Sequence, residues 1–211
     1  TESILGLPIR VVTEVLIGYL IFGAALVVTG GGKVFMDLAL ALLGRTRGGT
    51  AKVAVMSSAL FGSLSGSVLS NVVTTGKMTI PAMRRAGFPP AYAAGVEACA
   101  STGGTLMPPV MGAVAFIMAD FLRVSYSTVA IAALVPSILY YVTLLVQVDL
   151  FATKNNLSAT SREDIPQLRA VLSGGWHHIL GLVLLTYLLL ALRMETYAPY
   201  WATLFVVGIS I

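Results

Sequence analysis

The chain has 211 residues, of which 57% are hydrophobic and only 10% are charged, and its mean hydropathy is +0.90. A water-soluble domain carries roughly 25% charged residues, because its solvated surface must be covered with polar groups. The composition therefore excludes an ordinary soluble enzyme and a disordered protein, and a net charge of +4 is too small for a nucleic-acid-binding module. A single cysteine, Cys99, excludes a disulfide framework and a cysteine-rich metal site. These features predict an integral membrane protein that lies in a lipid bilayer.

Apolar segments along the chain predict an all-α, polytopic helical bundle. A helix that crosses the bilayer core of about 30 Å needs roughly 20 apolar residues. Three segments reach or approach this length, at residues 11–29, 127–148 and 176–192. The shorter apolar segment 34–43 is predicted to be an interfacial or connecting helix. Tyr197, Tyr200 and Trp201 are typical of a membrane interface, and another apolar run follows them.

The chain divides into three predicted regions. Residues 1–51 form a scaffold helix and the connecting helix, residues 52–123 a transport domain, and residues 124–211 further scaffold helices. Residues 153–167 are a polar linker, which we interpret as an extramembrane connector in preference to a binding segment. Ser161 and Asp164 in this linker resemble a helix-start signal. Because the chain begins with Thr rather than Met and stops inside an apolar run, we expect it to be an internal piece of a longer polypeptide.

A hairpin that enters and leaves the membrane on the same side is predicted between residues 53 and 83. The apolar arm 53–61 is about 14 Å long as a helix, half the bilayer, and it is followed by the Gly/Ser segment 62–67 and a second arm, 68–83. Six basic residues flank the two arms: Arg45, Arg47, Lys52, Lys77, Arg84 and Arg85. A spanning helix would place these two groups on opposite sides of the membrane, against the positive-inside rule. A re-entrant hairpin places both groups in the cytoplasm.

A discontinuous helix is predicted in the following segment. Residues 91–101 and 110–122 form two apolar arms, separated by Thr102-Gly103-Gly104-Thr105-Leu106-Met107-Pro108-Pro109. Two glycines and two prolines do not continue a helix, because proline lacks a backbone donor and clashes with the preceding turn. Two non-helical stretches rich in glycine and hydroxyl groups therefore fall at membrane depth.

Irregular backbone at this depth has two explanations. It survives only where protein buries it or where it lines a cavity, because each unsatisfied polar group costs several kcal/mol. Broken helices present carbonyl groups, which suit a hard cation such as Na⁺, and N–H groups, which suit a carboxylate. This pairing favours a cation-coupled carrier of organic anions. The alternative is close helix packing through glycine, with hydroxyl groups bonded to neighbouring helices.

The segments FGSLSGSVLSNVVTTGKMTIPAMRRAGF (61–88) and AGVEACASTGGTLMPPVMGAVAFIMADF (94–121) resemble the large membrane subunit of the tripartite ATP-independent periplasmic (TRAP) transporters, the DctM-like permeases. The resemblance runs from about residue 7 to residue 156. Val110-Met111-Gly112 after the proline pair is similar to the TAXI-type branch, in which the small and large membrane subunits are often fused. The broader family usually has serine directly after these prolines.

The resemblance implies a multi-pass permease of the prokaryotic cytoplasmic (inner) membrane. It implies elevator-type transport of organic acids driven by Na⁺, with an extracytoplasmic (periplasmic) substrate-binding protein and a small membrane subunit as partners, and no bound organic cofactor. This chain would contain the first of two inverted repeats. The residues that would line the ion and substrate site are Ser65, Gly66, Ser67 and Asn71 at the hairpin, and Ser101, Thr102, Gly103 and Gly104 at the broken helix. Ser65, Ser67 and Thr102 would contact Na⁺.

Glu97 is an ionisable residue in the first half of the broken helix. Such a group inside a membrane is costly, so it indicates either an ion or proton site or a structural hydrogen bond to neighbouring broken backbone. No enzyme motif is evident, since Leu64 stands where a Gly-x-Ser-x-Gly elbow has its nucleophile, and Gly30-Gly31-Gly32-Lys33 lacks P-loop spacing. An ion channel or passive pore built from broken helices, and a purely structural scaffold, remain alternatives to a carrier.

Overall fold

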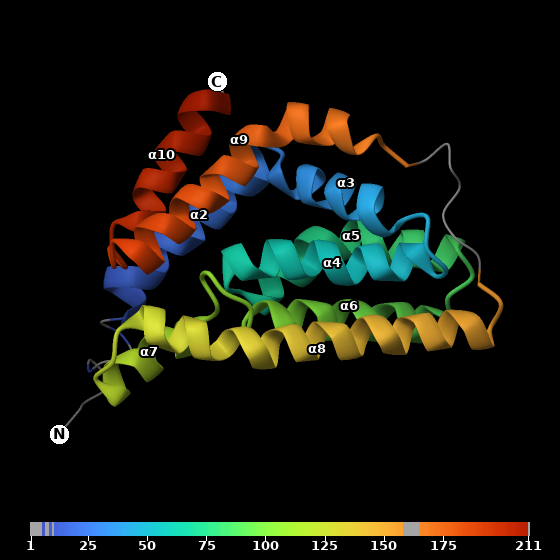
Figure 1. The fold of residues 1–211 in the computed structure, drawn as a ribbon, viewed down its shortest axis with the longest axis horizontal. Coiled ribbons are helices and arrows are strands. Elements are labelled where there is room, and N and C mark those ends of the chain that lie inside the picture. Colours follow the sequence, from blue (N-terminus) through green and yellow to red (C-terminus); the bar gives the residue numbers. More distant parts are fainter. Residues whose placement is uncertain (1–5, 7–8, 10, 158–164, 211) are drawn as a thin grey trace.

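The computed structural model describes residues 6, 9, 11–157 and 165–210, and every regular element in these residues is a helix. Two described helices are long and apolar enough to cross a membrane: α8 (Tyr126–Lys154), and the continuous helix formed by α9 (Leu168–Thr186) and η3 (Tyr187–Ala191). The bent pair of helices at Val12–Val28 and Gly31–Leu43 would make a third if the two are counted as one span. The prediction of an all-α membrane bundle is therefore confirmed (Figure 1).

The first segment contains η1 (Val12–Leu16), α2 (Ile17–Val28) and α3 (Gly31–Leu43). Helix α3 turns away from α2 by 70°, as Figure 1 shows. Gly30 allows this bend because its backbone is left-handed, with φ of +89°. The predicted helix at 11–29 and the short helix after it are both present.

The predicted hairpin consists of α4 (Gly49–Ser65) and α5 (Val68–Arg85), which pack against each other. The prediction of a six-residue break at 62–67 was wrong in extent, because α4 continues to Ser65 and only Gly66 and Ser67 separate the arms. Ser63 bonds the carbonyl of Leu60 within its own helix, and the end of α4 is buried, so glycine and serine are held in a helical conformation there. The first arm has 17 residues, about 25 Å, and is longer than predicted.

The discontinuous helix consists of α6 (Pro90–Gly104) and α7 (Ala113–Leu122). The break covers residues 105–112 and lies three residues further along the chain than predicted. Val110, Met111 and Gly112 belong to the break and not to the second arm, which corrects the sequence prediction. Met111 has φ of +58° and Gly112 is extended, so neither residue has a helical backbone.

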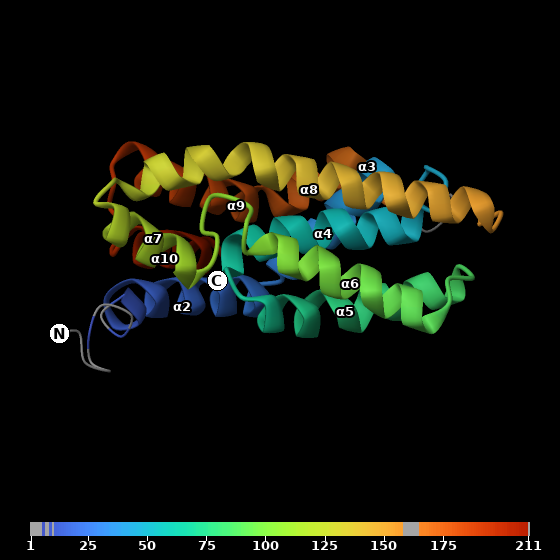
Figure 2. The same ribbon diagram turned by 90° about the horizontal axis from the view of Figure 1, so that it is seen from below.

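The last part of the chain contains α8, α9 and η3, followed by α10 (Ala198–Ser210). Helix α8 runs beside α4 and α6 for much of its length (Figures 1 and 2). Helix α9 begins at Leu168, eight residues before the predicted start. The helix-start residues proposed in the linker, Ser161 and Asp164, lie outside the described residues.

Two apolar cores hold these helices together. One core joins the end of α4, the break 105–112 and α7 to α2, η3, α10 and the start of α8, and Tyr126 is fully buried in it. The other joins α4, α5, α6 and the second half of α8. Because α4 and α8 contribute to both cores, the two breaks lie where the cores meet. The division at residues 51 and 123 stays a prediction.

Candidate functional site

The two breaks lie side by side, although about 40 residues separate them in sequence. The backbone N–H of Val110 donates to the carbonyl oxygen of Ser63 at 3.0 Å. Gly66 has φ of +59°, and a side chain there would overlap the carbonyl oxygen of Met111. Figures 1 and 2 both show the loop between α6 and α7 beside the end of α4. The tip of the hairpin and the break of the discontinuous helix therefore form one structural unit.

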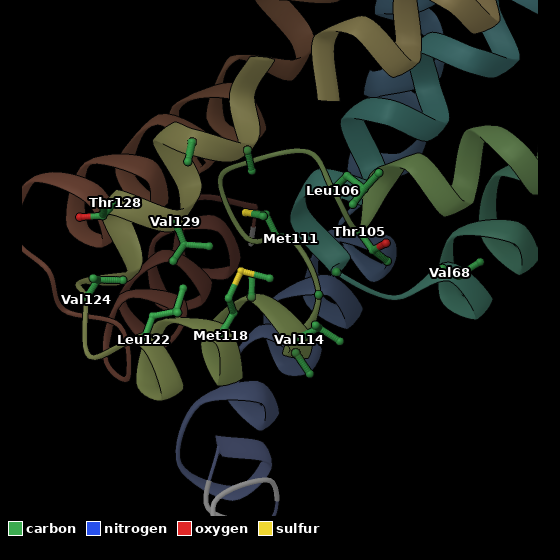
Figure 3. A pocket seen from close by; sticks show the side chains of 16 residues that line it. Val68, Thr105, Leu106, Met111, Val114, Met118, Leu122, Val124, Thr128 and Val129 are labelled. Atoms are coloured by element: carbon green, nitrogen blue, oxygen red, sulfur yellow. The ribbon is translucent and has the colours of Figure 1, made fainter. Parts of the chain in front are cut away.

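A cavity of about 750 Å³ opens at this unit (Figure 3). Gly66 and Val68 line it where α4 ends and α5 begins, and Thr105 and Ala113 line it where α6 ends and α7 begins. The carbonyl ends of two helices and the N–H ends of two others therefore border one space. Met111, Met118 and other apolar side chains complete the wall, and none of the described residues that line the cavity carries a charge.

The hairpin tip contains the predicted residues Ser65, Gly66 and Ser67. The Ser65 hydroxyl is buried and has no hydrogen-bond partner among the described residues, and Gly23 of α2 packs against this residue. Ser67 caps α5, since its hydroxyl oxygen accepts a bond from the Ser70 N–H at 3.3 Å. Ser65 and Ser67 flank Gly66 but are not themselves among the residues that line the cavity.

Asn71 lies one turn below the tip, where α4 and α6 cross. The crossing is close because Gly62 and Gly104 face each other without side chains, and a Cβ atom on Gly104 would lie 2.6 Å from the Gly62 Cα atom. The Asn71 amide lies next to both glycines and donates to the Ser58 carbonyl at 2.8 Å. Asn71 and Gly104 therefore lie together, and the close contact explains the glycine at 104.

Thr102 and Gly103 lie on other faces of α6. The exposed Thr102 hydroxyl donates to the Ala98 carbonyl at 2.8 Å. Gly103 faces α8, where a Cβ atom would lie 2.5 Å from the Tyr140 ring and 2.9 Å from the Tyr141 ring. The structure therefore does not bring the Thr102 hydroxyl or Gly103 together with Ser65 and Ser67.

Glu97 is fully buried between α4, α5 and α6, and only hydroxyl groups of the described residues bond its carboxyl. Oε1 accepts from Ser58 at 2.9 Å, from Thr75 at 2.5 Å and from Ser101 at 3.2 Å, and Oε2 accepts from Thr79 at 2.5 Å. We call these five residues the hydroxyl box. The predicted site residues Glu97 and Ser101 therefore lie together, and neither is among the residues that line the cavity.

Sequence reasoning missed several residues of this region. Ser58, Thr75 and Thr79 were not identified, although the four-residue spacing of Asn71, Thr75 and Thr79 places three polar groups on one face of a helix. Tyr126 was also missed. Its buried hydroxyl lies 2.8 Å from the Pro109 carbonyl and 2.5 Å from the Val110 carbonyl, so it fixes the break from α8. No local signal in the sequence connects this tyrosine to the break.

Comparison with known proteins identifies the family. The sequence model of the family described as "Tripartite ATP-independent periplasmic transporter, DctM component" matches residues 2–211. The chain belongs to this family. The TRAP large subunit expected from the sequence motifs is confirmed, whereas the assignment to the TAXI-type branch stays a prediction. Members of the family are transporter components, so the prediction that the chain is not an enzyme is also confirmed.

Individual TRAP permeases resemble the chain over most of its length. It is 32% identical over 181 residues to the C4-dicarboxylate TRAP transporter large permease protein DctM of Pseudomonas aeruginosa, 86% of this chain and 41% of that protein. It is 26% identical over 154 residues to the 2,3-diketo-L-gulonate TRAP transporter large permease protein YiaN of Escherichia coli, covering 72% and 36%. It is 28% identical over 150 residues to the sialic acid TRAP transporter permease protein SiaT of Haemophilus influenzae, covering 71% and 24%. The chain thus spans at most about two fifths of these relatives.

Proposed function

We propose that the chain is part of the permease of a Na⁺-coupled, binding-protein-dependent secondary transporter that takes up organic acids across a bacterial inner membrane. Three relatives are named for C4-dicarboxylate, 2,3-diketo-L-gulonate and sialic acid, all of which are organic acids. These names support the substrate class. The family name supports two partners for the full protein, a periplasmic binding protein and a small membrane subunit.

The observation that carries the proposal is the convergence of four helix ends at one cavity. The ends of α4 and α6 direct partial negative charge and carbonyl oxygens toward this region, and the beginnings of α5 and α7 direct partial positive charge and N–H groups toward it. The first pair suits a cation and the second suits a carboxylate. This is the arrangement by which broken helices bind a coupling ion and an anionic substrate at the middle of a membrane.

We assign the Na⁺ ligands of this repeat to Ser65, Ser67 and Thr102. The unpartnered hydroxyl of Ser65 supports the assignment, because a buried polar group without a partner costs about 1–3 kcal/mol unless a ligand satisfies it. Ser67 adds an oxygen on the other side of Gly66. Thr102 would join them only after a movement of the end of α6, since its hydroxyl now bonds Ala98.

The proposed transport cycle is of the elevator type, in which the hairpin and the broken helix move together. Their direct contacts support such joint movement, since Val110 bonds Ser63 and Gly62 packs on Gly104. The contact of the hairpin with α2 at Gly23 has no side chain on the α2 side, which suits a surface along which the tip slides.

Reconstitution of the full-length permease tests this function. Proteoliposomes that hold the permease and its small subunit are supplied with the binding protein, an organic acid and either a Na⁺ or a proton gradient. We expect saturable uptake that requires the binding protein and the Na⁺ gradient. Ser65→Ala should lower the uptake, whereas Ser173→Ala on the exposed face of α9 should not. Conductance without saturation would identify a channel, and full uptake by Ser65→Ala would remove this serine from the site.

A further inference from the structure

We propose that Glu97 binds and releases a proton during transport, with the hydroxyl box as its proton-binding site. The inference rests on the proposed transport function and adds a second, protonic step to it. A buried carboxyl can be a silent part of the packing, as the sequence alone allowed. Three features of its described surroundings favour a group that changes its protonation state: the lack of a counter-charge, the mobile hydrogens of its partners, and the lack of space for a metal ion.

No positive charge faces Glu97 from the described helices packed around it. On α4, Lys52 lies six residues before Ser58 and is bonded to Asp149 of α8 at 2.6 Å. On α5, Lys77 is exposed, and Gly76 is the neighbour that packs on the Glu97 side chain. On α6, the other titratable groups are Tyr92, whose ring stacks on Phe151 of α8, and the exposed Cys99. No counter-charge therefore holds Glu97 in one protonation state, and its hydrogen-bond partners are hydroxyl groups alone.

The remaining titratable groups near this part of α6 are two tyrosines of α8, and both face away from the box. Tyr140 donates its hydroxyl hydrogen to the Cys99 carbonyl at 2.8 Å, and Tyr141 donates to the Ala100 carbonyl at 2.9 Å. Both tyrosines are therefore engaged with the backbone on the opposite side of α6. Among the described residues, Glu97 is the group of this region that can take up a proton.

Two of the four hydroxyl partners of Glu97, Thr75 and Thr79, have a backbone carbonyl as a second acceptor for their hydrogens. Thr79 can donate to Glu97 or to the carbonyl of Thr75 at 3.0 Å, and Thr75 can donate to Glu97 or to the carbonyl of Asn71 at 2.9 Å. When the carboxyl is ionised, both hydroxyls donate to it. When a proton binds to Oε2, the new O–H donates to Thr79, whose own hydrogen turns to the Thr75 carbonyl. Both protonation states are therefore fully hydrogen-bonded, and only hydroxyl rotations separate them.

The box has no space for a metal ion between its oxygen atoms. The Glu97 oxygens lie 2.5–3.2 Å from four hydroxyl oxygens, which are hydrogen-bond distances. A cation such as Ca²⁺ holds its oxygen ligands at about 2.3–2.6 Å from the metal, which keeps neighbouring ligands further apart than hydrogen-bonded oxygens. A proton is the cation that fits this geometry.

The box also connects to the breaks through Asn71 and Ser101. Thr75 contacts the backbone and side-chain oxygens of Asn71, at 2.9 and 3.2 Å, and the Asn71 amide lies at the crossing of Gly62 and Gly104. Ser101 lies one turn before the end of α6. Thr75, which contacts both the Glu97 carboxyl and Asn71, therefore connects the protonated group to the place where the hairpin and the broken helix touch. The proton enters from water on one side of the membrane and leaves to water on the other, with no change of redox state.

The test uses the full-length permease and compares Glu97→Gln with Asp120→Asn, which removes an exposed carboxyl from α7. The first measurement is infrared difference spectroscopy of the purified protein over a pH series. We expect a band of a protonated carboxyl that is lost in Glu97→Gln and retained in Asp120→Asn. The second is uptake of the organic acid into proteoliposomes that carry an inward Na⁺ gradient, measured with and without an added proton gradient. We expect stimulation of the wild type and of Asp120→Asn, and loss of this stimulation in Glu97→Gln.

An exchange assay separates failure of the inference from failure of the proposed function. Exchange of labelled for unlabelled substrate needs no net proton movement, so Glu97→Gln should retain it. Wild-type protein without uptake or exchange would overturn the transport function itself. Active wild type together with full proton stimulation in Glu97→Gln would overturn only the role of Glu97. If Glu97→Gln does not fold, Thr79→Val should shift the carboxyl band, because it removes the partner of Oε2; an unchanged band would overturn the proposal.

Discussion

The two breaks in the membrane helices are built in different ways. The hairpin tip reverses the chain with only Gly66 and Ser67, one in a left-handed conformation and the other capping the next helix. The break 105–112 is four times as long, and its position depends on groups from other helices. Val110 bonds Ser63 of α4, and the Tyr126 hydroxyl of α8 bonds the carbonyls of Pro109 and Val110.

This difference separates local from tertiary control of irregular backbone. The hairpin tip is determined by the conformational preferences of its own residues, so it should fold as soon as α4 and α5 meet. The longer break takes its shape only when α4 and α8 are in place. A substitution at the tip should therefore affect the hairpin directly, whereas the longer break should be loosened by a substitution in a distant helix.

Gly66→Ala should have the largest effect on the folded state. A left-handed backbone costs a residue with a side chain about 1–2 kcal/mol, and the added Cβ would also overlap the Met111 carbonyl oxygen. Thermal unfolding of the full-length protein in detergent measures the loss. Gly95→Ala on α6 is the matched control, since no atom lies within 4 Å of a Cβ there. It should gain about 0.5–1 kcal/mol from its helical position. A loss at Gly95 as large as that at Gly66 would contradict the requirement for glycine at the tip.

Gly104→Ala should have a smaller but clear effect, because it separates α4 from α6 at their crossing. The added Cβ would lie 2.6 Å from the Cα atom of Gly62 and 3.3 Å from the amide of Asn71. Overpacking of this kind costs about 1–3 kcal/mol. The same unfolding assay checks it, with Gly174→Ala in open space on α9 as control. Equal stability of the two variants would mean that the crossing is looser than the structure indicates.

Much of the fold follows from local signals in the sequence. Apolar length predicted the long helices, and the glycine and proline clusters predicted both breaks. The exact limits of the breaks could not be predicted from local signals. At the hairpin, burial holds Ser63 and Leu64 in a helix. At the longer break, bonds to Ser63 and Tyr126 hold Val110 and its neighbour Met111 outside a helix. The hydroxyl box had a partial signal in the spacing of α5, but its completion by Glu97 depends on how three helices pack.

Tyr126→Phe should loosen the longer break without unfolding the protein. The substitution removes a buried hydroxyl and leaves the carbonyls of Pro109 and Val110 without this donor, which costs about 1–3 kcal/mol. The ring should stay stacked on Phe116, whose centroid lies 4.2 Å away. A Thr105→Cys probe at the cavity should react faster with a thiol label when it is combined with Tyr126→Phe. Tyr197→Phe, at an exposed position, should leave the labelling rate unchanged; equal acceleration by both variants would contradict the role of Tyr126.

Two substitutions of Ser67 separate its structural role from its proposed role in ion binding, and they should have the smallest effect on stability. Ser67→Ala removes the cap of α5 and should cost about 0.5–1 kcal/mol, because the capping bond is long at 3.3 Å. Ser67→Asn restores an equivalent cap, so its stability should return to that of the wild type. The larger amide, however, changes the oxygen next to Gly66. If Ser67 contacts Na⁺, Ser67→Asn should unfold normally but need a higher Na⁺ concentration for half-maximal uptake. Normal Na⁺ dependence in this variant would leave Ser67 with the cap alone and assign the ion at the hairpin tip to Ser65.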